Sequence, residues 1–462
     1  MITIKTKKIP AKNGRTQYRK TAGDAGAPIP PAGAPLRLCV AMSALVVAGA
    51  GLLAANEVSD WNHVMLEATL KATPTVPATP APVSTRSTAI VQAAVFDAVN
   101  GIDRQYTPIF VRHSGPRHAS KRAAAVQAAY AILIRLYPTQ SDTLDEQRSA
   151  SLNEIDRAWG ADSNESIEKG IKWGQTVADE IWAWRSKDGF ADVPPPFTGG
   201  TAPGEWRPTP PGNAPGLAPQ LAQVTPWVIK SPSQFRPFAP PALDSLEYAT
   251  DFNETKLMGS SSSATRTQDQ TQFALFWQAG NPPDFWDPVA ISLAEKHQFS
   301  LLRTARLLAQ VNLAMSDAML GCWDAKYTYA FWRPITAITL ADTDNNPDTI
   351  ADPNWTPLIP TPPFPEYPSA HSCASGAAVA VLSHYFGEDI PITVTNDALP
   401  GQSRSYWSFS AALDEVVDAR VFGGIHFRNS CKVGQALGGN VGAYVVKHAL
   451  QRIDGRHWRE RD

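Results

Sequence analysis

One stretch, residues 362–382 (PPFPEYPSAHSCASGAAVAVL), most constrains how this chain can fold. Its first half is too rich in proline to lie inside a helix, because proline lacks the amide hydrogen and clashes with the preceding turn. Its second half is small and apolar and is typical of a buried helix. The change falls at Ser369, Ala370 and His371. Free N–H groups at a helix N-terminus carry partial positive charge, so we expect these residues beside an anion-binding position.

Two further stretches supply basic side chains and a second imidazole. Lys326 and Arg333 are seven residues apart, two helical turns, so we expect both on one side of one helix. Arg420 and His426 follow near the C-terminus. Each residue alone has an ordinary interpretation, a solvated surface cation or a histidine bonded to backbone. The combination is far more specific than any single motif, and it favours an oxyanion-binding enzyme.

Hydrophobic spacing predicts helices throughout, and no convincing run of alternating residues predicts strands. Helices are expected at 56–72, 87–100, 121–137, 140–159, 164–184, 244–259, 265–277, 288–322, 327–340, 369–385, 408–423 and 429–450. Loops are expected at 73–85 and 342–367, and a proline-rich loop region at 189–241. The predicted fold class is all-α, with helical bundles and long proline-rich loops.

The N-terminus resembles an export signal. Residues 1–37 are polar and basic, and residues 38–55 form an uncharged run rich in alanine, valine and leucine. We expect a signal that directs export to the periplasm or the exterior, with an uncleaved single-pass membrane anchor as the alternative. The predicted division is 1–55 as leader, 56–240 as an N-terminal helical region with the proline-rich loop, and 241–462 as the C-terminal catalytic region.

Composition argues against a nucleic-acid partner and against a disulfide-bonded scaffold. Charged residues make up 18% of the 462, the net charge is −2, and no basic stripe lies outside the N-terminus, so no nucleic-acid partner is expected. Four cysteines are present, of which Cys39 lies in the apolar run. The remaining Cys322, Cys373 and Cys431 lack metal-type spacing, and we expect buried free thiols.

In chain order, Lys326-x6-Arg333-Pro334, Pro368-Ser369-Ala370-His371 and Arg420-x5-His426 form a three-part pattern. The pattern resembles the signature shared by vanadium-dependent haloperoxidases and type-2 phosphatidic acid phosphatases. The resemblance is clearest over residues 323–450. Two further segments, 204–211 (GEWRPTPP) and 251–256 (DFNETK), are similar to bacterial haloperoxidase-like proteins.

The resemblance implies a role for each residue of the pattern. His426 would bond to the vanadium of a vanadate cofactor, or attack phosphorus in a phosphatase, and His371 would be the acid–base group. The oxyanion would be held by Lys326, Arg333, Ser369, the backbone N–H of Ala370, and Arg420. Lys326 would also take part in catalysis by polarising bound peroxide.

Three functions follow from this resemblance. The first is an exported vanadium-dependent haloperoxidase that oxidises halide with hydrogen peroxide and so halogenates an organic acceptor. The second is an exported acid phosphatase acting on phosphate esters through a phosphohistidine. The third is a non-catalytic oxyanion-binding homologue. All partners would be small molecules, with a membrane involved only if the N-terminal segment is uncleaved.

Three features distinguish among these functions. Trp323 and Phe364 match the aromatic positions that flank the halide in fungal-type chloroperoxidases, although plain core aromatics would look the same. Ala370 replaces the family's usual glycine, and its methyl group would crowd the oxyanion. Ser430 replaces the acidic residue that phosphatases place four after the second histidine, which weakens the phosphatase alternative. Asp317 is expected either to pair with an arginine or to lie on the surface.

Overall fold

The computed structural model describes residues 56–71, 79–158 and 162–453. Residues 55–462 form one compact unit. The predicted leader lies outside the described residues, so the signal and the three-part division of the chain remain predictions. No helix within the described ranges is both long and apolar enough to cross a membrane.

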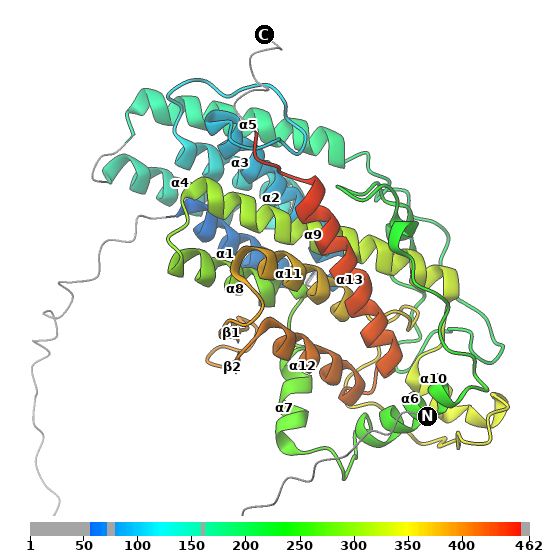
Figure 1. The fold of residues 1–462 in the computed structure, drawn as a ribbon. Helices are drawn as coiled ribbons and strands as arrows, with labels where there is room; N and C mark the ends of the chain where they lie inside the picture. The colour runs from blue at the N-terminus through cyan, green and yellow to red at the C-terminus, as the bar shows by residue number, and fades with distance from the viewer. Residues whose placement is uncertain (1–55, 72–78, 159–161, 454–462) are drawn as a thin grey trace, which may run out of the picture. The chain divides into compact units, whose positions relative to one another are not determined.

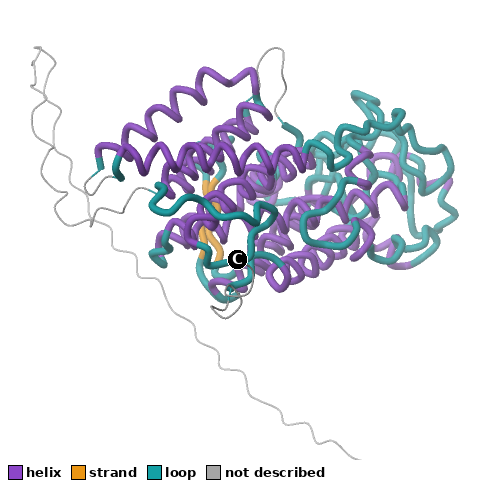
Figure 2. The backbone as a smooth tube through the Cα atoms, turned by 90° about the horizontal axis from the view of Figure 1, so that it is seen from above, coloured by secondary structure: helices purple, strands orange, loops and turns teal. Residues whose placement is uncertain are grey.

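The described residues form thirteen α-helices and one two-stranded antiparallel hairpin (Figures 1 and 2). The first seven helices are α1 (Glu57–Leu70), α2 (Ala81–Asp103), α3 (Lys121–Leu136), α4 (Ser141–Arg157), α5 (Asn164–Arg185), α6 (Leu246–Met258) and α7 (Gln268–Phe276). The others are α8 (Pro282–Lys296), α9 (Leu301–Tyr329), α10 (Pro334–Thr339), α11 (Ala370–Phe386), α12 (Phe409–Phe422) and α13 (Arg428–His448). The all-α prediction is confirmed.

Helix α9 is the centre of the packing, with α2, α8, α11 and α13 against it. Nearly its whole length is buried, as expected for a helix enclosed by others, and its buried polar residues include Asp317 and Lys326. Helices α11 and α13 run side by side (Figure 1). Their backbones approach so closely that a side chain at Gly438 would collide with the Cys373 carbonyl. This contact fixes the start of α11 against the middle of α13.

Two predicted helices were wrong in their bounds. The single helix expected at 288–322 is two helices, because α8 ends at Lys296 and Gln298 adopts a left-handed φ of 52°. Ser300 then starts α9 by accepting a hydrogen bond from the Arg303 N–H. Helix α8 itself begins earlier, at Pro282, after Asn281.

The helix expected at 327–340 was also wrong. Helix α9 continues to Tyr329 and ends where Ala330 takes a left-handed φ of 45°. Arg333 is the N-cap of the separate helix α10, and Pro334 is its first residue, where a missing N–H costs nothing. Lys326 and Arg333 therefore lie on different elements, not on one side of one helix.

Two loop predictions need correction. Part of the loop expected at 73–85 is helical, because α2 already starts at Ala81, directly after Pro80. The absence of strands was also wrong, since β1 (Ile392–Thr395) pairs with β2 (Ser403–Tyr406). The hairpin follows α11 and is drawn in orange in Figure 2. Strand β1 does alternate buried and exposed residues, but each strand has only four residues, too few for the alternation to be recognised in the sequence.

Buried carboxylates hold the long loops to the helices. Asp317 of α9 accepts hydrogen bonds from the N–H groups of Trp227, Val228 and Ile229, at 2.8, 2.8 and 3.0 Å. Asp317 is fully buried, so the surface alternative is wrong; its carboxylate binds these backbone N–H groups, and the charge of Arg185 also favours its ionised form. Asp97 of α2 binds three successive N–H groups of the 109–111 loop in the same way.

We expect Asp287 of α8 to make the free energy of unfolding depend on pH. It is fully buried and accepts hydrogen bonds from the side-chain amides of Asn62 (2.8 Å) and Asn312 (2.9 and 3.0 Å). Burial raises the pKa of Asp287 from 3.8 to about 7. Between those values the folded state holds a proton that the unfolded state releases. Asp287 therefore makes the free energy of unfolding fall as pH rises, by at most about 1.4 kcal/mol per pH unit.

Denaturant unfolding at pH 4.5 to 6.5 measures this slope. We expect Asp287→Asn to make it less negative, because the neutral amide cannot ionise. Asp414→Asn, at an exposed position of α12, should leave it unchanged. An Asp287→Asn protein with the wild-type slope would contradict the prediction.

Candidate active site

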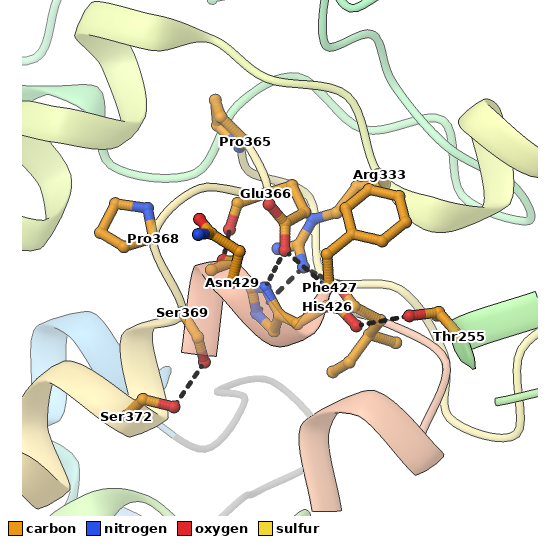
Figure 3. Close-up of polar contacts among 12 residues, drawn as sticks. Thr255, Arg333, Pro365, Glu366, Pro368, Ser369, Ser372, His426, Phe427 and Asn429 are labelled. Atoms are coloured by element: carbon orange, nitrogen blue, oxygen red, sulfur yellow. Dashed lines mark hydrogen bonds and ion pairs between the residues drawn. The ribbon is translucent and has the colours of Figure 1, made fainter. Parts of the chain in front are cut away.

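The predicted basic side chains and imidazoles come together around one cavity. Phe364, Ala370, His371, Arg420 and His426 line a cavity of about 500 Å³. Arg333 lies directly behind it, with Nη1 3.2 Å from Nε2 of His426. Lys326 lies close by and donates to the carbonyls of Pro365 and Glu366, the second of which is the residue beside His426 in Figure 3. The structure thus brings together residues from the ends of α9 and α12, the α10 and α11 N-termini, and the turn before α13.

His426 lies in the short turn between α12 and α13. The turn requires Gly424, which has a φ of 75° and leaves no room for a side chain beside Gly259. Nδ1 of His426 is 2.8 Å from Oε1 of Glu366, which also accepts the Phe427 N–H at 3.0 Å. Because the carboxylate is an acceptor, we assign the imidazole proton to Nδ1 and the lone pair to Nε2.

The surroundings of His426 keep it neutral. Burial lowers its pKa well below the ordinary value, and the positive charges of Arg333, Lys326 and Arg420 lower it further. Its unprotonated Nε2 accepts a hydrogen bond from Nη1 of Arg333, and a neutral imidazole with that lone pair can serve as a metal ligand or a nucleophile. The geometry therefore agrees with the position predicted for His426, whose chemical role remains a prediction.

Glu366 is the functional residue that the sequence did not reveal. It is fully buried, and burial raises its pKa to about 7, although Lys326, the Phe427 N–H and Arg333 all favour the ionised form. Glu366 thus answers the objection to the phosphatase alternative, which was that His426 lacks a carboxylate partner. Ser430 does lack a carboxylate, but Glu366 places one on the same imidazole. The only sequence signal was one acidic residue within a proline-rich, otherwise uncharged stretch.

The arginines are held by backbone and amide oxygens and keep donors to spare. Arg333 donates from Nε to the Phe364 carbonyl (2.8 Å) and from Nη1 to the Ile425 carbonyl (2.7 Å). Arg420 donates from Nη2 to Oε1 of Gln278 (2.9 Å). Within the described chain, Nη2 of Arg333 and both Nε and Nη1 of Arg420 are buried without an acceptor. Buried donors are rarely left unpaired, so these nitrogens point to an anion.

Lys326 and His371 complete the ring of donors. Nζ of Lys326 donates to the carbonyls of Pro365 (2.7 Å) and Glu366 (2.9 Å), which leaves one of its three hydrogens. Nε2 of His371 is buried and has no partner among the described residues. Burial lowers the pKa of Lys326 to about 8 and that of His371 well below its ordinary value.

The start of α11 is placed as the sequence predicted. Ser369 is the N-cap, its N–H donates to the Ser430 carbonyl (3.1 Å), and its Oγ accepts from Ser372 (3.2 Å). Ala370 is the first helical residue and lines the cavity, so its N–H belongs to the free first turn. Its helical conformation needs no glycine, and a methyl group is accommodated there in this structure.

The two halide-site candidates pack against each other, with ring centroids 5.0 Å apart. Phe364 lines the cavity, and its ring lies 4.7 Å from the guanidinium of Arg333 and 5.1 Å from Nζ of Lys326. Trp323 is fully buried, and its indole N–H donates to the Leu217 carbonyl. Phe364 is thus an apolar wall of the site supported by cations, and the halide role of both residues remains a prediction.

Segment 251–256 holds the turn that carries His426. Asp251 accepts the Asn429 N–H at 2.6 Å, and the hydroxyl of Thr255 donates to the His426 carbonyl at 3.3 Å (Figure 3). Glu254 forms a two-pronged ion pair with Arg428, both bonds 2.7 Å. Every one of these contacts joins α6 to residues 426–429. The segment therefore positions the histidine without touching the cavity.

Segment 204–211 likewise holds in place the extended residues that precede Arg333. The Trp206 N–H donates to the Ala330 carbonyl (2.6 Å), and the Trp332 N–H donates to the Gly204 carbonyl (2.9 Å). Phe331 and Trp332 also pack with Tyr248 and other apolar residues in a second, smaller core. Both segments singled out in the sequence are thus supports of the site.

The donor set suits an oxyanion better than a bare metal cation. Across the described ranges, no three histidine, cysteine, aspartate or glutamate side chains are grouped so as to hold a metal ion. The cysteines also match expectation, since Cys322, Cys373 and Cys431 are buried and free. One unprotonated imidazole nitrogen surrounded by guanidinium and ammonium donors fits vanadate or phosphate.

Fold and site together describe a mostly helical protein with buried cations and imidazoles around one cavity, and comparison with known proteins shows what it is similar to. Residues 306–455 match the family model of the VCPO second helical-bundle domain. The vanadium chloroperoxidase of Curvularia inaequalis is 27% identical over 406 residues, 72% of this chain and 66% of that protein. These similarities support placing the chain in the superfamily of vanadium haloperoxidases and type-2 phosphatidic acid phosphatases.

Solved structures agree with this assignment. The first bacterial vanadium-dependent iodoperoxidase is 27% identical, with a TM-score of 0.73 over 86% of this chain and 97% of that one. A holo-type bacterial vanadium-dependent chloroperoxidase is 18% identical, with a TM-score of 0.63 over 84% of this chain and 98% of that one, which shows the fold alone. The chain covers just under two thirds of the length of the Curvularia protein.

Arg420 offers a direct test of the oxyanion site. Arg420→Ala removes two unpaired buried donors, so we expect phosphate to bind at least about tenfold more weakly, as for a lost charge-assisted hydrogen bond. Isothermal titration with inorganic phosphate measures the change. The matched control is Lys447→Ala, which removes an exposed cation at the far end of α13. Equal phosphate affinity in all three proteins would refute the assignment.

Proposed function

We propose that this protein is a vanadium-dependent haloperoxidase, which uses hydrogen peroxide to oxidise a halide that then halogenates an organic acceptor. The observation that carries the proposal is the set of unpaired buried donors of Arg333 and Arg420 beside Nε2 of His426, which lies 3.2 Å from Nη1 of Arg333. The similarity to a bacterial iodoperoxidase over almost its whole length supports the peroxidase branch.

In this proposal each residue around the cavity has its own role. His426 would hold vanadate through Nε2, and Lys326, Arg333 and Arg420 would neutralise its oxygens together with Ser369 and the Ala370 N–H. Vanadate, when bound, supplies the electrophilic centre that activates peroxide. His371, neutral and facing the same cavity, would accept a proton from peroxide at Nε2 and return it to the departing oxygen.

The apolar wall of the cavity would affect how a halide binds. Phe364 presents an apolar ring beside the cations, and a halide there would lose part of its water shell. The relatives include an iodoperoxidase and chloroperoxidases, so iodide, bromide and chloride should be compared directly. We also propose export through residues 1–55, on the basic and apolar pattern of that segment alone.

A phosphatase is the second candidate, and one contact favours it. The hydrogen bond from His426 Nδ1 to Glu366 would assist attack by Nε2 on phosphorus, because the carboxylate stabilises the positive charge that develops on the ring. His371 would then protonate the leaving oxygen. The same site serves both chemistries, since phosphate and vanadate share their geometry.

Paired assays separate these functions. Purified protein, with and without vanadate, is tested for peroxide- and halide-dependent halogenation of an organic acceptor, and separately for hydrolysis of a phosphate ester. Halogenation that requires vanadate supports the proposal, and halogenation that appears without vanadate contradicts it. Hydrolysis that vanadate inhibits supports the phosphatase. Phosphate binding with neither activity indicates a non-catalytic homologue.

The two imidazoles are predicted to fail in different ways. His426→Ala should abolish vanadate binding, because it removes the only nitrogen ligand. His371→Ala should keep vanadate binding and lose turnover by about 10² to 10⁴-fold, as when a general acid–base is removed. Equilibrium dialysis and the halogenation rate measure the two effects, with His63→Ala at an exposed position of α1 as control. Full vanadate binding by His426→Ala would refute the ligand assignment.

A further inference from the structure

The carboxylate that contacts His426 comes from an unexpected place. In the family resemblance, phosphatases carry an acidic residue four positions after the second histidine, one helical turn away. Here that residue is Ser430, buried in the first turn of α13. The carboxylate instead belongs to Glu366, which lies 60 positions before His426 and three residues before Ser369.

Glu366 is held more firmly than an ordinary ion-pair partner. Its backbone N–H donates to the Phe331 carbonyl at 2.9 Å, and its own carbonyl accepts from Lys326 at 2.9 Å. Oε1 then receives two hydrogen bonds, from Nδ1 of His426 and from the Phe427 N–H. One oxygen therefore fixes both the imidazole ring and the backbone beside it.

We propose that Glu366 is the positioning residue of this site and takes over the function of the acidic residue missing at position 430. It keeps the proton of His426 on Nδ1 and so leaves the Nε2 lone pair for the oxyanion. Carboxylate–histidine pairs orient metal-binding imidazoles in this way, and losing such a partner typically lowers metal affinity or activity 10–100-fold. The effect on vanadate rests on the function proposed above, while the effect on the imidazole proton does not.

The structure also shows where a substitute carboxylate would fit. Glu366 and Ser430 both line one small cavity of about 10 Å³, which shares no lining residue with the cavity of about 500 Å³. The Ser430 hydroxyl also lies near the Glu366 carbonyl, at 3.5 Å. Removing the Glu366 side chain enlarges the space next to residue 430. An aspartate placed there would reach His426 from the following helical turn.

Two measurements on the full chain test the proposal. Equilibrium dialysis gives the vanadate dissociation constant, and long-range ¹⁵N–¹H NMR of histidine-labelled protein, without vanadate, shows which nitrogen of His426 carries the proton. His426→Ala assigns the signal. We expect Glu366→Ala to weaken vanadate binding 10–100-fold and to move the proton toward Nε2. Glu366→Gln, which keeps an acceptor but no charge, should keep the proton on Nδ1 and weaken binding less.

A rescue and a matched control separate positioning from general loosening. The double variant Glu366→Ala, Ser430→Asp should recover most of the affinity and return the proton to Nδ1. Glu254→Gln removes a carboxylate that holds the same turn through Arg428, without touching His426, and should leave the His426 tautomer unchanged.

Three results would overturn the proposal: a wild-type tautomer and affinity in Glu366→Ala, a double variant no better than Glu366→Ala, or an equal change in Glu254→Gln. If the wild-type protein binds no vanadate but the proton still moves in Glu366→Ala, the positioning role stands and the haloperoxidase function fails.

Discussion

The site depends on burying three cations with very little opposing charge. Lys326 and Arg333 are 0% exposed and Arg420 is 2% exposed, and Glu366 is the nearby carboxylate that faces them. Burial of charge is costly unless hydrogen bonds and counter-charge offset it. Burial accordingly lowers the pKa of Arg333 to about 9 and that of Arg420 to about 10. A bound oxyanion would supply the missing counter-charge, so this arrangement of cations favours binding one.

The helical framework makes this burial affordable by supplying rigid oxygen acceptors. Backbone carbonyls of residues 364–366 and of Ile425 accept hydrogen bonds from Lys326 and Arg333. These bonds fix the directions in which the remaining N–H groups of the two side chains point. That segment is proline-rich and so has few conformations to lose on folding. Behind it, the close contact of α11 with α13 sets Ser369 and the turn of His426 at a constant separation. The precision of the site thus comes from backbone geometry as much as from the side chains.

Much of this arrangement was predictable from residue types and spacing. The all-α class, the start of the central helix at Ser369 and the convergence of the two imidazoles with the three basic residues all follow from patterns in the sequence. The break between α9 and α10 did not, because it depends on a left-handed residue, Ala330, that has no special propensity for it. The contacts of Asp317 and Glu366 cross 88–90 and 60 positions respectively, and helical periodicity carries no information about such pairs. Trp323 was assigned correctly to the neighbourhood of Phe364, but its burial behind that ring is visible only in three dimensions.

The account requires a single oxyanion to sit among side chains that are far apart in sequence. A crystal structure of the protein soaked in vanadate, with the anomalous signal of vanadium used to place the atom, tests this most directly. We predict one vanadium peak within bonding distance of Nε2 of His426, with its oxygens facing Lys326, Arg333 and Arg420. A peak elsewhere on the protein, or an ordered site in which those residues contact no vanadate at all, would contradict the account.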